Sequence, residues 1–299
     1  MTNGIDVMLG DILAGLQLFD RFKKKYLNDN YKEEKVTTIA TRLVALFESH
    51  GVHRNQIEEF FGHGLDIPSF ANDDKLLEKI TPEIINDAAK LFGINKDWLE
   101  GSSNEIYNIP DFYKHPEDFD HCLISLLEKA TANKLYAYAL KSNKKSFNTF
   151  NDSLIVIAET IGEINNREIY KYHLIGNWGI HYWKSRAYFT ACCALLYKHG
   201  LSVAGKVVES KWIDDVYEGR KLLEYDYIEK YGGVSFPSVG SWIVSDFVEM
   251  PDEYLKGMNT EQGRATLLAL EKWLDLSEKG YMRCFPDDEI FHTNIVNDF

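Results

Sequence analysis

Apolar positions in the first third of the chain recur every three or four residues. Residues 5–25 place seven apolar side chains on one helical face, which predicts an amphipathic helix followed by a polar loop to residue 37. That helix either packs on the rest of its own chain or pairs with a second copy. From residue 38 to 101 the same spacing returns in short stretches that end at glycines, and Thr81-Pro82 opens one of them. This pattern predicts a compact all-helical domain over residues 38–101.

The remaining two thirds of the chain alternates between helical and strand patterns. Residues 102–117 are polar and contain Pro110 and Pro116, which is typical of a linker. Residues 118–231 follow the order α-β-β-β-α-β-α, which predicts a small α/β domain with a mixed sheet, and residues 232–299 predict a C-terminal helical extension. The expected fold class is α+β, with a helical domain, an α/β domain for sensing or dimerisation, and a C-terminal helix.

Charge and cysteine usage narrow the possible partners. The 299-residue chain has a formal net charge of −13, which argues against non-specific binding to nucleic acid or to an anionic membrane. No apolar run approaches the roughly 20 residues of a membrane span. Residues 1–10 lack the features of a signal peptide. The four cysteines have no CxxC spacing, so we expect a reduced, cytoplasmic protein without membrane contact.

Three segments of the predicted helical domain carry a family resemblance. They read RLVALFESHG (residues 42–51), VHRNQIEEFFG (residues 52–62) and DAAKLFGINKDWLEG (residues 87–101). In this order and spacing they resemble the lambda-repressor/Cro-like (XRE-type) helix-turn-helix family, over about a fifth of the chain. The resemblance implies a DNA-binding transcriptional regulator, and it implies a homodimer because such heads usually read paired half-sites.

The resemblance also indicates which residues would contact DNA. It places the reading helix within residues 63–74, with Ile67 and Phe70 at its two core positions. The candidate DNA contacts are Arg42, His53, Arg54, Asn55, Gln56, Ser69 and Asn72.

The sequence departs from the family in the reading helix itself. Its exposed positions carry no Arg, Lys or Gln, Pro68 shortens it, and Asp66 and the Asp73-Asp74 pair would face phosphate with like charge. The sequence is therefore compatible with two functions. One is a DNA-binding regulator with a sensing or dimerisation domain, and the other is an adaptor that reuses the fold to bind protein.

Candidate chemistry gathers in one predicted loop between a strand and a helix. The chain has no Gly-rich phosphate loop, no HExxH and no GxSxG, so we expect no enzyme activity, no cofactor and no metal. Residues 177–186 (NWGIHYWKSR) could form a ligand pocket, and its candidates are Trp178, His181, Trp183 and Arg186. The alternatives are that the aromatic residues are core anchors, that Ser185 caps the helix, or that an enzyme uses this loop.

Overall fold

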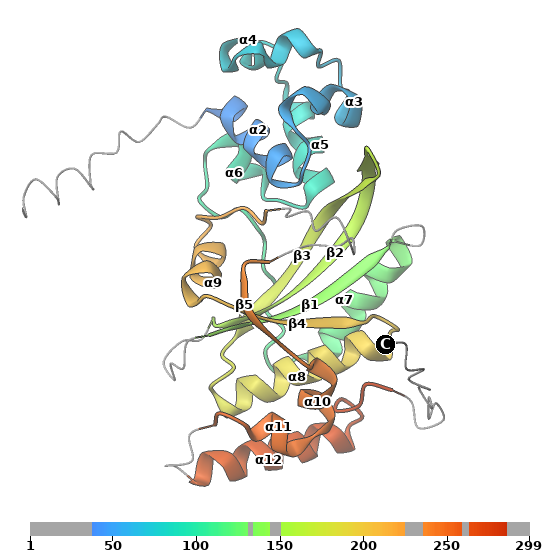
Figure 1. The fold of residues 1–299 in the computed structure, drawn as a ribbon, viewed down its shortest axis with the longest axis vertical. Coiled ribbons are helices and arrows are strands. Elements are labelled where there is room, and N and C mark those ends of the chain that lie inside the picture. Colours follow the sequence, from blue (N-terminus) through green and yellow to red (C-terminus); the bar gives the residue numbers. More distant parts are fainter. Residues whose placement is uncertain (1–37, 131–133, 144–150, 225–235, 259–262, 286–299) are drawn as a thin grey trace, which may run out of the picture. The chain divides into compact units, whose positions relative to one another are not determined.

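The computed structural model describes residues 38–130, 134–143, 151–224, 236–258 and 263–285. Within these ranges the chain is a mixed α/β protein with eleven α-helices, two short 3₁₀ turns and one five-stranded sheet (Figure 1). None of the described helices is long and apolar enough to cross a membrane. The amphipathic helix predicted for residues 5–25 lies outside the described residues.

All regular elements within residues 39–101 are α-helices or short 3₁₀ turns. These elements are α2 (Ile39–Ser49), η1 (Arg54–Gln56), α3 (Ile57–Phe61), η2 (Ile67–Ala71), α4 (Asp73–Leu77), α5 (Pro82–Phe92) and α6 (Lys96–Glu100). The predicted caps are present. Thr81 Oγ1 accepts a hydrogen bond from the Ile84 N–H at 3.3 Å, and Gly93 ends α5 with a positive φ of 70°.

The segment predicted to be a reading helix is not one continuous helix. Asp66 caps a five-residue 3₁₀ turn, η2, and Asn72 then adopts an extended conformation and caps the separate helix α4. Ile67, predicted to be a core residue, is 59% exposed, so that prediction was wrong, whereas Phe70 is buried as predicted. In the short turn η2 the buried side chains are those of Ser69 and Phe70, and Ile67, the first residue of the turn, lies outside the core.

The sheet has the strand order β3-β2-β1-β4-β5. Its elements are α7 (Pro116–Lys129), β1 (Leu135–Ser142), β2 (Ser153–Ile164), β3 (Arg167–Trp178), α8 (Trp183–Lys198), β4 (Val203–Val208), α9 (Ser210–Tyr217) and β5 (Ser238–Trp242). Strands β1 and β4 are parallel, and every other neighbouring pair is antiparallel. This confirms the predicted α-β-β-β-α-β-α order. Strand β5 lies in the expected C-terminal helical extension, in which the sequence allowed either a short helix or a strand over residues 241–250.

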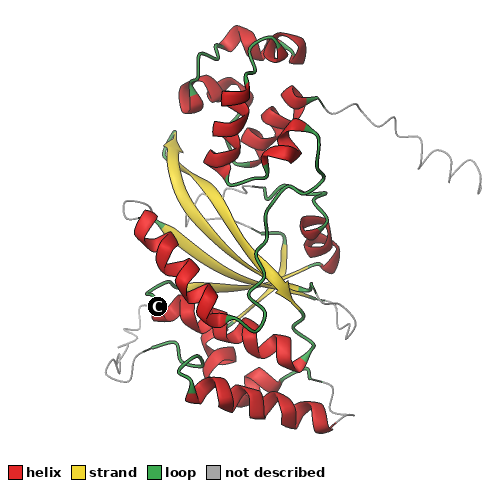
Figure 2. Cartoon of the chain, turned by 180° about the vertical axis from the view of Figure 1, so that it is seen from behind, coloured by secondary structure: helices red, strands yellow, loops and turns green. Residues whose placement is uncertain are grey.

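The C-terminal part adds three helices after β5. These are α10 (Val244–Glu249), α11 (Pro251–Leu255) and α12 (Gly263–Glu278). Contacts between α12 and α8, and between α10 and α8, attach this part to the same side of the sheet as α7 (Figure 2).

Both faces of the sheet are buried. Alternate residues along a strand pack into two different hydrophobic cores, one on each face. Tyr138 and Leu140 face a core shared with residues 39–101 and α9, whereas Ala137 and Ala139 face a core shared with α7, α8 and α10–α12. This is the period-two alternation of a strand, applied to a sheet covered on both sides. The helical segment and the sheet therefore share one continuous hydrophobic core.

Candidate functional site

Most of the candidate DNA-contact residues hold the helical segment together. Arg42 donates from Nη1 to the Trp98 carbonyl, and its guanidinium lies 5.5 Å from the centroid of the Trp98 ring. Arg54 donates from Nε to the Phe70 carbonyl at 2.7 Å and pairs through Nη2 with Asp73 at 2.9 Å. Both arginines are thus engaged by neighbours from elsewhere in the segment.

The polar candidates divide between capping roles and solvent. Ser69 is 3% exposed and bonds Asp66, and the Asn72 side chain accepts from the Lys75 N–H at 2.9 Å. The Gln56 side chain accepts from the His53 N–H at 3.1 Å. The remaining candidate, Asn55, is exposed, as is the side chain of His53.

The surface around the expected reading region is acidic. Residues 53–79 contain six carboxylates and three cations, a net charge of −3. These residues are Glu58, Glu59, Asp66, Asp73, Asp74 and Glu78 against Arg54, Lys75 and Lys79. Because a DNA-binding protein gains most of its affinity by neutralising phosphates with cations, this segment is poorly suited to DNA.

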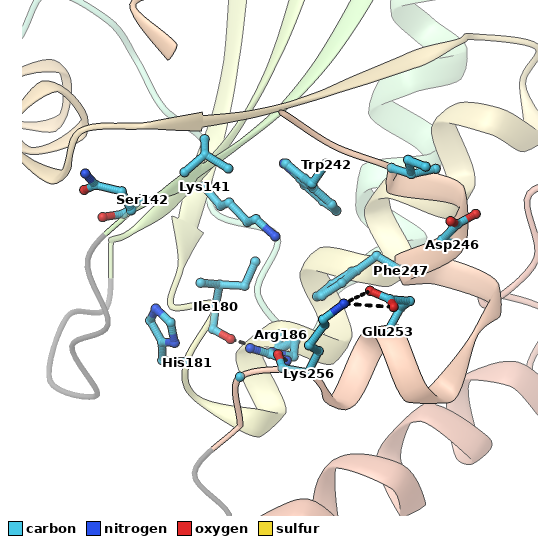
Figure 3. Close-up of a pocket in the computed structure, with 14 residues that line it drawn as sticks. Lys141, Ser142, Ile180, His181, Arg186, Trp242, Asp246, Phe247, Glu253 and Lys256 are labelled. Atoms are coloured by element: carbon cyan, nitrogen blue, oxygen red, sulfur yellow. Dashed lines mark hydrogen bonds and ion pairs between the residues drawn. The ribbon is translucent and has the colours of Figure 1, made fainter. Parts of the chain in front are cut away.

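A second region has the features of a ligand site. A pocket of about 640 Å³ opens where β1 and β5 end beside α8, α10 and α11 (Figure 3). Its wall combines apolar and charged groups, namely Lys141, Ser142, Asn143, Ile180, His181, Arg186, Val207, Trp242, Ile243, Asp246, Phe247, Glu253, Lys256 and Gly257.

Arg186 is the buried cation of this pocket. It is 2% exposed and lies in the first turns of α8. Its Nε donates to the Ile180 carbonyl at 2.6 Å, and Nη1 donates to the carbonyls of Tyr254 at 2.5 Å and Lys256 at 3.1 Å. Burial lowers the pKa of Arg186 to about 10, which nearby Tyr254 and Asp152 oppose, so the guanidinium stays charged at neutral pH.

No carboxylate in the described part of the chain forms an ion pair with Arg186. Its hydrogen bonds all go to backbone carbonyls and use Nε and Nη1, which leaves the Nη2 amino group without a hydrogen bond to described residues. Burying a charge without a directly bonded counter-ion is costly, and the nearby carboxylate of Asp152 offsets the desolvation of the guanidinium only in part.

Lys141 is the second cation, at the end of β1. Its Nζ lies 4.3 Å from the centroid of the Trp242 ring and 5.5 Å from that of Phe247, and the side chain reaches into the pocket (Figure 3). Burial and the charges of Arg186 and Lys256 together lower the pKa of Lys141 to about 8, although the carboxylate of Glu253 opposes them. Among the described residues its ammonium has aromatic faces as neighbours but no hydrogen-bonded acceptor.

The remaining charges of the pocket largely compensate one another. Glu253 bonds Lys256 through both carboxylate oxygens at 3.1 and 3.2 Å. His181 lies 3.9 Å from the buried carboxylate of Asp152, which in turn accepts from the Ile180 N–H at 2.6 Å. Asp152 therefore fixes the loop that carries His181.

Two of the four predicted ligand residues meet in this pocket and two do not. His181 and Arg186 line it, as predicted. Trp178 is fully buried against Phe189 in the core, and Trp183 packs on the same core outside the pocket lining. Both tryptophans are therefore core residues, which was the alternative to a role in ligand binding. Ser185 does not cap α8, since its hydroxyl accepts from the Gly179 N–H at 2.8 Å inside the preceding loop.

Sequence reasoning missed Lys141 and Trp242. Lys141 ends an apolar strand, LYAYALK, and a lysine at that position is ordinarily read as a strand terminus facing solvent. Trp242 comes from β5, where the sequence pattern left a short helix and a strand as alternatives. The one available signal was the placement of a cation directly after a run of buried residues.

The described residues contain no group of three or more His, Cys, Asp or Glu side chains that could hold a metal ion. The arrangement instead suits a small organic anion, with apolar contacts from Trp242 and Phe247 and positive charge from Lys141 and Arg186. Comparisons of the chain with protein-family models, curated protein sequences and solved structures returned no match.

Proposed function

We propose that this chain is a ligand-responsive regulatory protein whose sheet binds a small organic anion in the Lys141–Arg186 pocket. The observation that carries the proposal is the buried guanidinium of Arg186, which has no carboxylate partner among the described residues and borders a pocket that also contains Lys141. An anion that reached both cations would supply a counter-charge in direct contact with them, in addition to the nearby carboxylates of Asp152 and Glu253.

The charge balance of the pocket supports this assignment. Its lining contains three cations, Lys141, Arg186 and Lys256, against the two carboxylates of Asp246 and Glu253. This net charge of +1 stands out in a chain whose formal charge is −13. One charge-assisted hydrogen bond contributes about 1.5–3 kcal/mol, so an anion bound to both cations would bind at least tenfold more tightly than its neutral analogue.

The test is calorimetric titration of the full-length protein with a panel of small carboxylates and phosphates and their amide or alcohol analogues. We expect Lys141→Gln to weaken binding of the anions at least tenfold. The matched control is Lys198→Gln, an exposed lysine on the same helix as Arg186 and about 18 Å further along it. Equal affinity for anions and neutral analogues, or equal effects of the two substitutions, would contradict the proposal.

We infer that the regulator acts by binding another protein through residues 53–79. The order of helices in residues 39–101 is consistent with the proposed helix-turn-helix resemblance, and the net charge of −3 on residues 53–79 favours a basic protein surface as the partner. The proposed protein is a cytoplasmic homodimer, and light scattering of the purified chain tests the dimer.

Sequence-specific DNA binding is the second candidate, favoured by the exposed side chains of His53 and Asn55 at the start of η1, from where they could contact backbone phosphate. Selection of bound fragments from a genomic DNA pool at two salt concentrations separates the two outputs. Enriched sites that are lost in the His53→Ala/Asn55→Ala variant would establish DNA binding and rule out the adaptor. No enrichment at low salt by folded protein would leave the protein contact as the output.

A further inference from the structure

Lys141 differs from the other cations of its pocket because its amino group has no hydrogen-bonded or ion-paired partner among the described residues, and Glu253 acts on it only at a distance. Lys256 is paired with Glu253, and Arg186 is anchored on three backbone carbonyls. Lys141 lies instead against the rings of Trp242 and Phe247, half-buried, with its amino group toward the open volume of the pocket (Figure 3).

An amine in such surroundings is a nucleophile near neutral pH. Apolar surroundings and a neighbouring cation both disfavour the ammonium form, which is the usual way in which a protein activates a lysine for attack on a carbonyl group. Here the two conditions coincide, since burial and the charge of Arg186 both lower the pKa of Lys141, to about 8.

We propose that Lys141 forms a Schiff base with a small 2-oxo acid whose carboxylate binds to Arg186. This inference rests on the anion-binding function proposed above and names the class of anion. In a 2-oxo acid the electrophilic carbonyl carbon is bonded directly to the carboxylate, so one short molecule presents both the anion and the carbonyl.

The two cations lie beside the same aromatic ring of the pocket. Lys141 Nζ and Arg186 Cζ each lie 5.5 Å from the centroid of the same Phe247 ring, so they cannot be more than 11 Å apart. The available donor on Arg186 is Nη2, since its other two nitrogens are occupied by carbonyls. In the proposed complex a carboxylate is hydrogen-bonded there, at about 2.9 Å, and its neighbouring carbonyl carbon lies toward Lys141.

The reaction needs no further reagent. The Lys141 ammonium releases a proton, its nitrogen lone pair attacks the carbonyl carbon, and the C–N bond forms as the carbonyl π electrons move to oxygen. The resulting carbinolamine loses its hydroxyl group as water, taking up the released proton, and leaves a protonated imine. The net change is one ammonium and one carbonyl giving one iminium and one water, without oxidation or reduction.

The test is reductive trapping followed by mass spectrometry of peptides. Full-length protein is incubated at pH 7 with pyruvate, glyoxylate or 2-oxoglutarate and cyanoborohydride, which converts an imine into a stable secondary amine. At pH 7 a lysine with a pKa of about 8 is roughly 300-fold more deprotonated than one with the reference pKa of 10.5. Because a weaker base is also a weaker nucleophile, we expect at least a tenfold excess of the adduct on Lys141 over exposed Lys198.

Two controls separate this inference from anion binding itself. Lactate carries the carboxylate but no carbonyl, so it should bind without trapping, and Lys141→Arg keeps the positive charge but cannot form an imine. Calorimetry with lactate and pyruvate is run on the same samples. An adduct concentrated on Lys141 and abolished in Lys141→Arg would establish the Schiff base.

The other possible results contradict either the Schiff base alone or the Schiff base together with the anion pocket. Binding of pyruvate and lactate with equal affinity and no excess adduct on Lys141 overturns the Schiff base and leaves the anion pocket intact. Adducts spread evenly over the lysines also overturn it. Failure of every carboxylate and phosphate of the panel to bind to folded protein overturns the anion pocket together with the Schiff base.

Discussion

His50 provides a test of how the helical segment joins the sheet. The residue follows α2, is fully buried, and pairs through Nδ1 with the Tyr170 carbonyl of β3 at 2.6 Å. Its ring lies 4.2 Å from the centroid of Phe92 in α5 and 4.9 Å from that of Tyr172 in β3. Its Nε2 is buried without a hydrogen-bond partner among the described residues. The imidazole therefore joins the two parts of the chain in its neutral form.

The size of the effect follows from the shift in pKa. Burial lowers the pKa of His50 from 6.5 to about 4, and the hydrogen bond with the Tyr170 carbonyl opposes this only in part. The unfolded chain thus binds a proton at a higher pH than the folded chain does, so folding is penalised as the pH falls below 6.5. The penalty is about 2 kcal/mol at pH 5, reaches about 3 kcal/mol near and below pH 4, and is absent above pH 7.

The perturbation is His50→Asn, which can keep an N–H donor toward Tyr170 but has no titratable ring. Urea unfolding of the wild type and of the variant is measured at pH 7.5 and pH 5. The loss of the ring and its packing makes the variant less stable at pH 7.5, by about 1–3 kcal/mol. The variant should lose about 2 kcal/mol less than the wild type between the two pH values, because other titrating groups contribute equally to both.

The decisive quantity is the change in the free energy of unfolding between pH 7.5 and pH 5, compared between the wild type and His50→Asn. Equal loss of stability in both proteins between pH 7.5 and pH 5 would show that His50 titrates normally, and hence that water reaches the junction of the helical segment with β3. The unfolding transition should also stay single, since residues 39–101 and the sheet share one core.

Other substitutions test packing and capping. Gly176→Ala in β3 would drive its methyl group into the hydroxyl of Tyr217, which is fixed by the Asn177 N–H at 2.8 Å and the Ser153 carbonyl at 2.9 Å; we expect a loss of about 2–3 kcal/mol in urea unfolding. Gly240→Ala is the control, because its methyl group would meet only ordinary contacts, and it should change stability by less than about 0.5 kcal/mol. Thr81→Ala removes the cap of α5 and should cost about 1 kcal/mol, and no loss would mean that solvent replaces the cap fully.

Local signals in the sequence predicted the regular elements well. Thr81-Pro82 opens α5 because a capping hydroxyl and a proline at the first helical position act on their immediate neighbours. Asn165-Asn166 makes the β2–β3 turn with positive φ at both residues, the conformation that asparagine tolerates best. Such features depend on a few adjacent residues, so they can be read without knowing the tertiary structure.

The pocket could not be predicted in the same way. Lys141 belongs to β1, Arg186 to α8 and Trp242 to β5, and only the crossing of these elements brings them together. Ile67 illustrates the same limit within the helical segment, because this apolar residue begins a five-residue turn and is exposed, whereas Phe70 of the same turn is buried. Apolar spacing over so short an element does not determine which of its residues the tertiary structure covers.

The two cations of the pocket have different consequences for the fold, and this difference determines how function can be tested. Arg186 binds carbonyls of the loop before α8 and of residues 254 and 256, so its removal would leave three buried acceptors unsatisfied and damage the fold together with any site. Lys141 donates no hydrogen bond to the described residues, and desolvation acts against its charge. Replacing it by a neutral side chain of similar length should leave stability unchanged or raise it. Lys141→Gln is therefore the substitution whose loss of binding can be attributed to the pocket, whereas loss of binding in an Arg186 variant cannot.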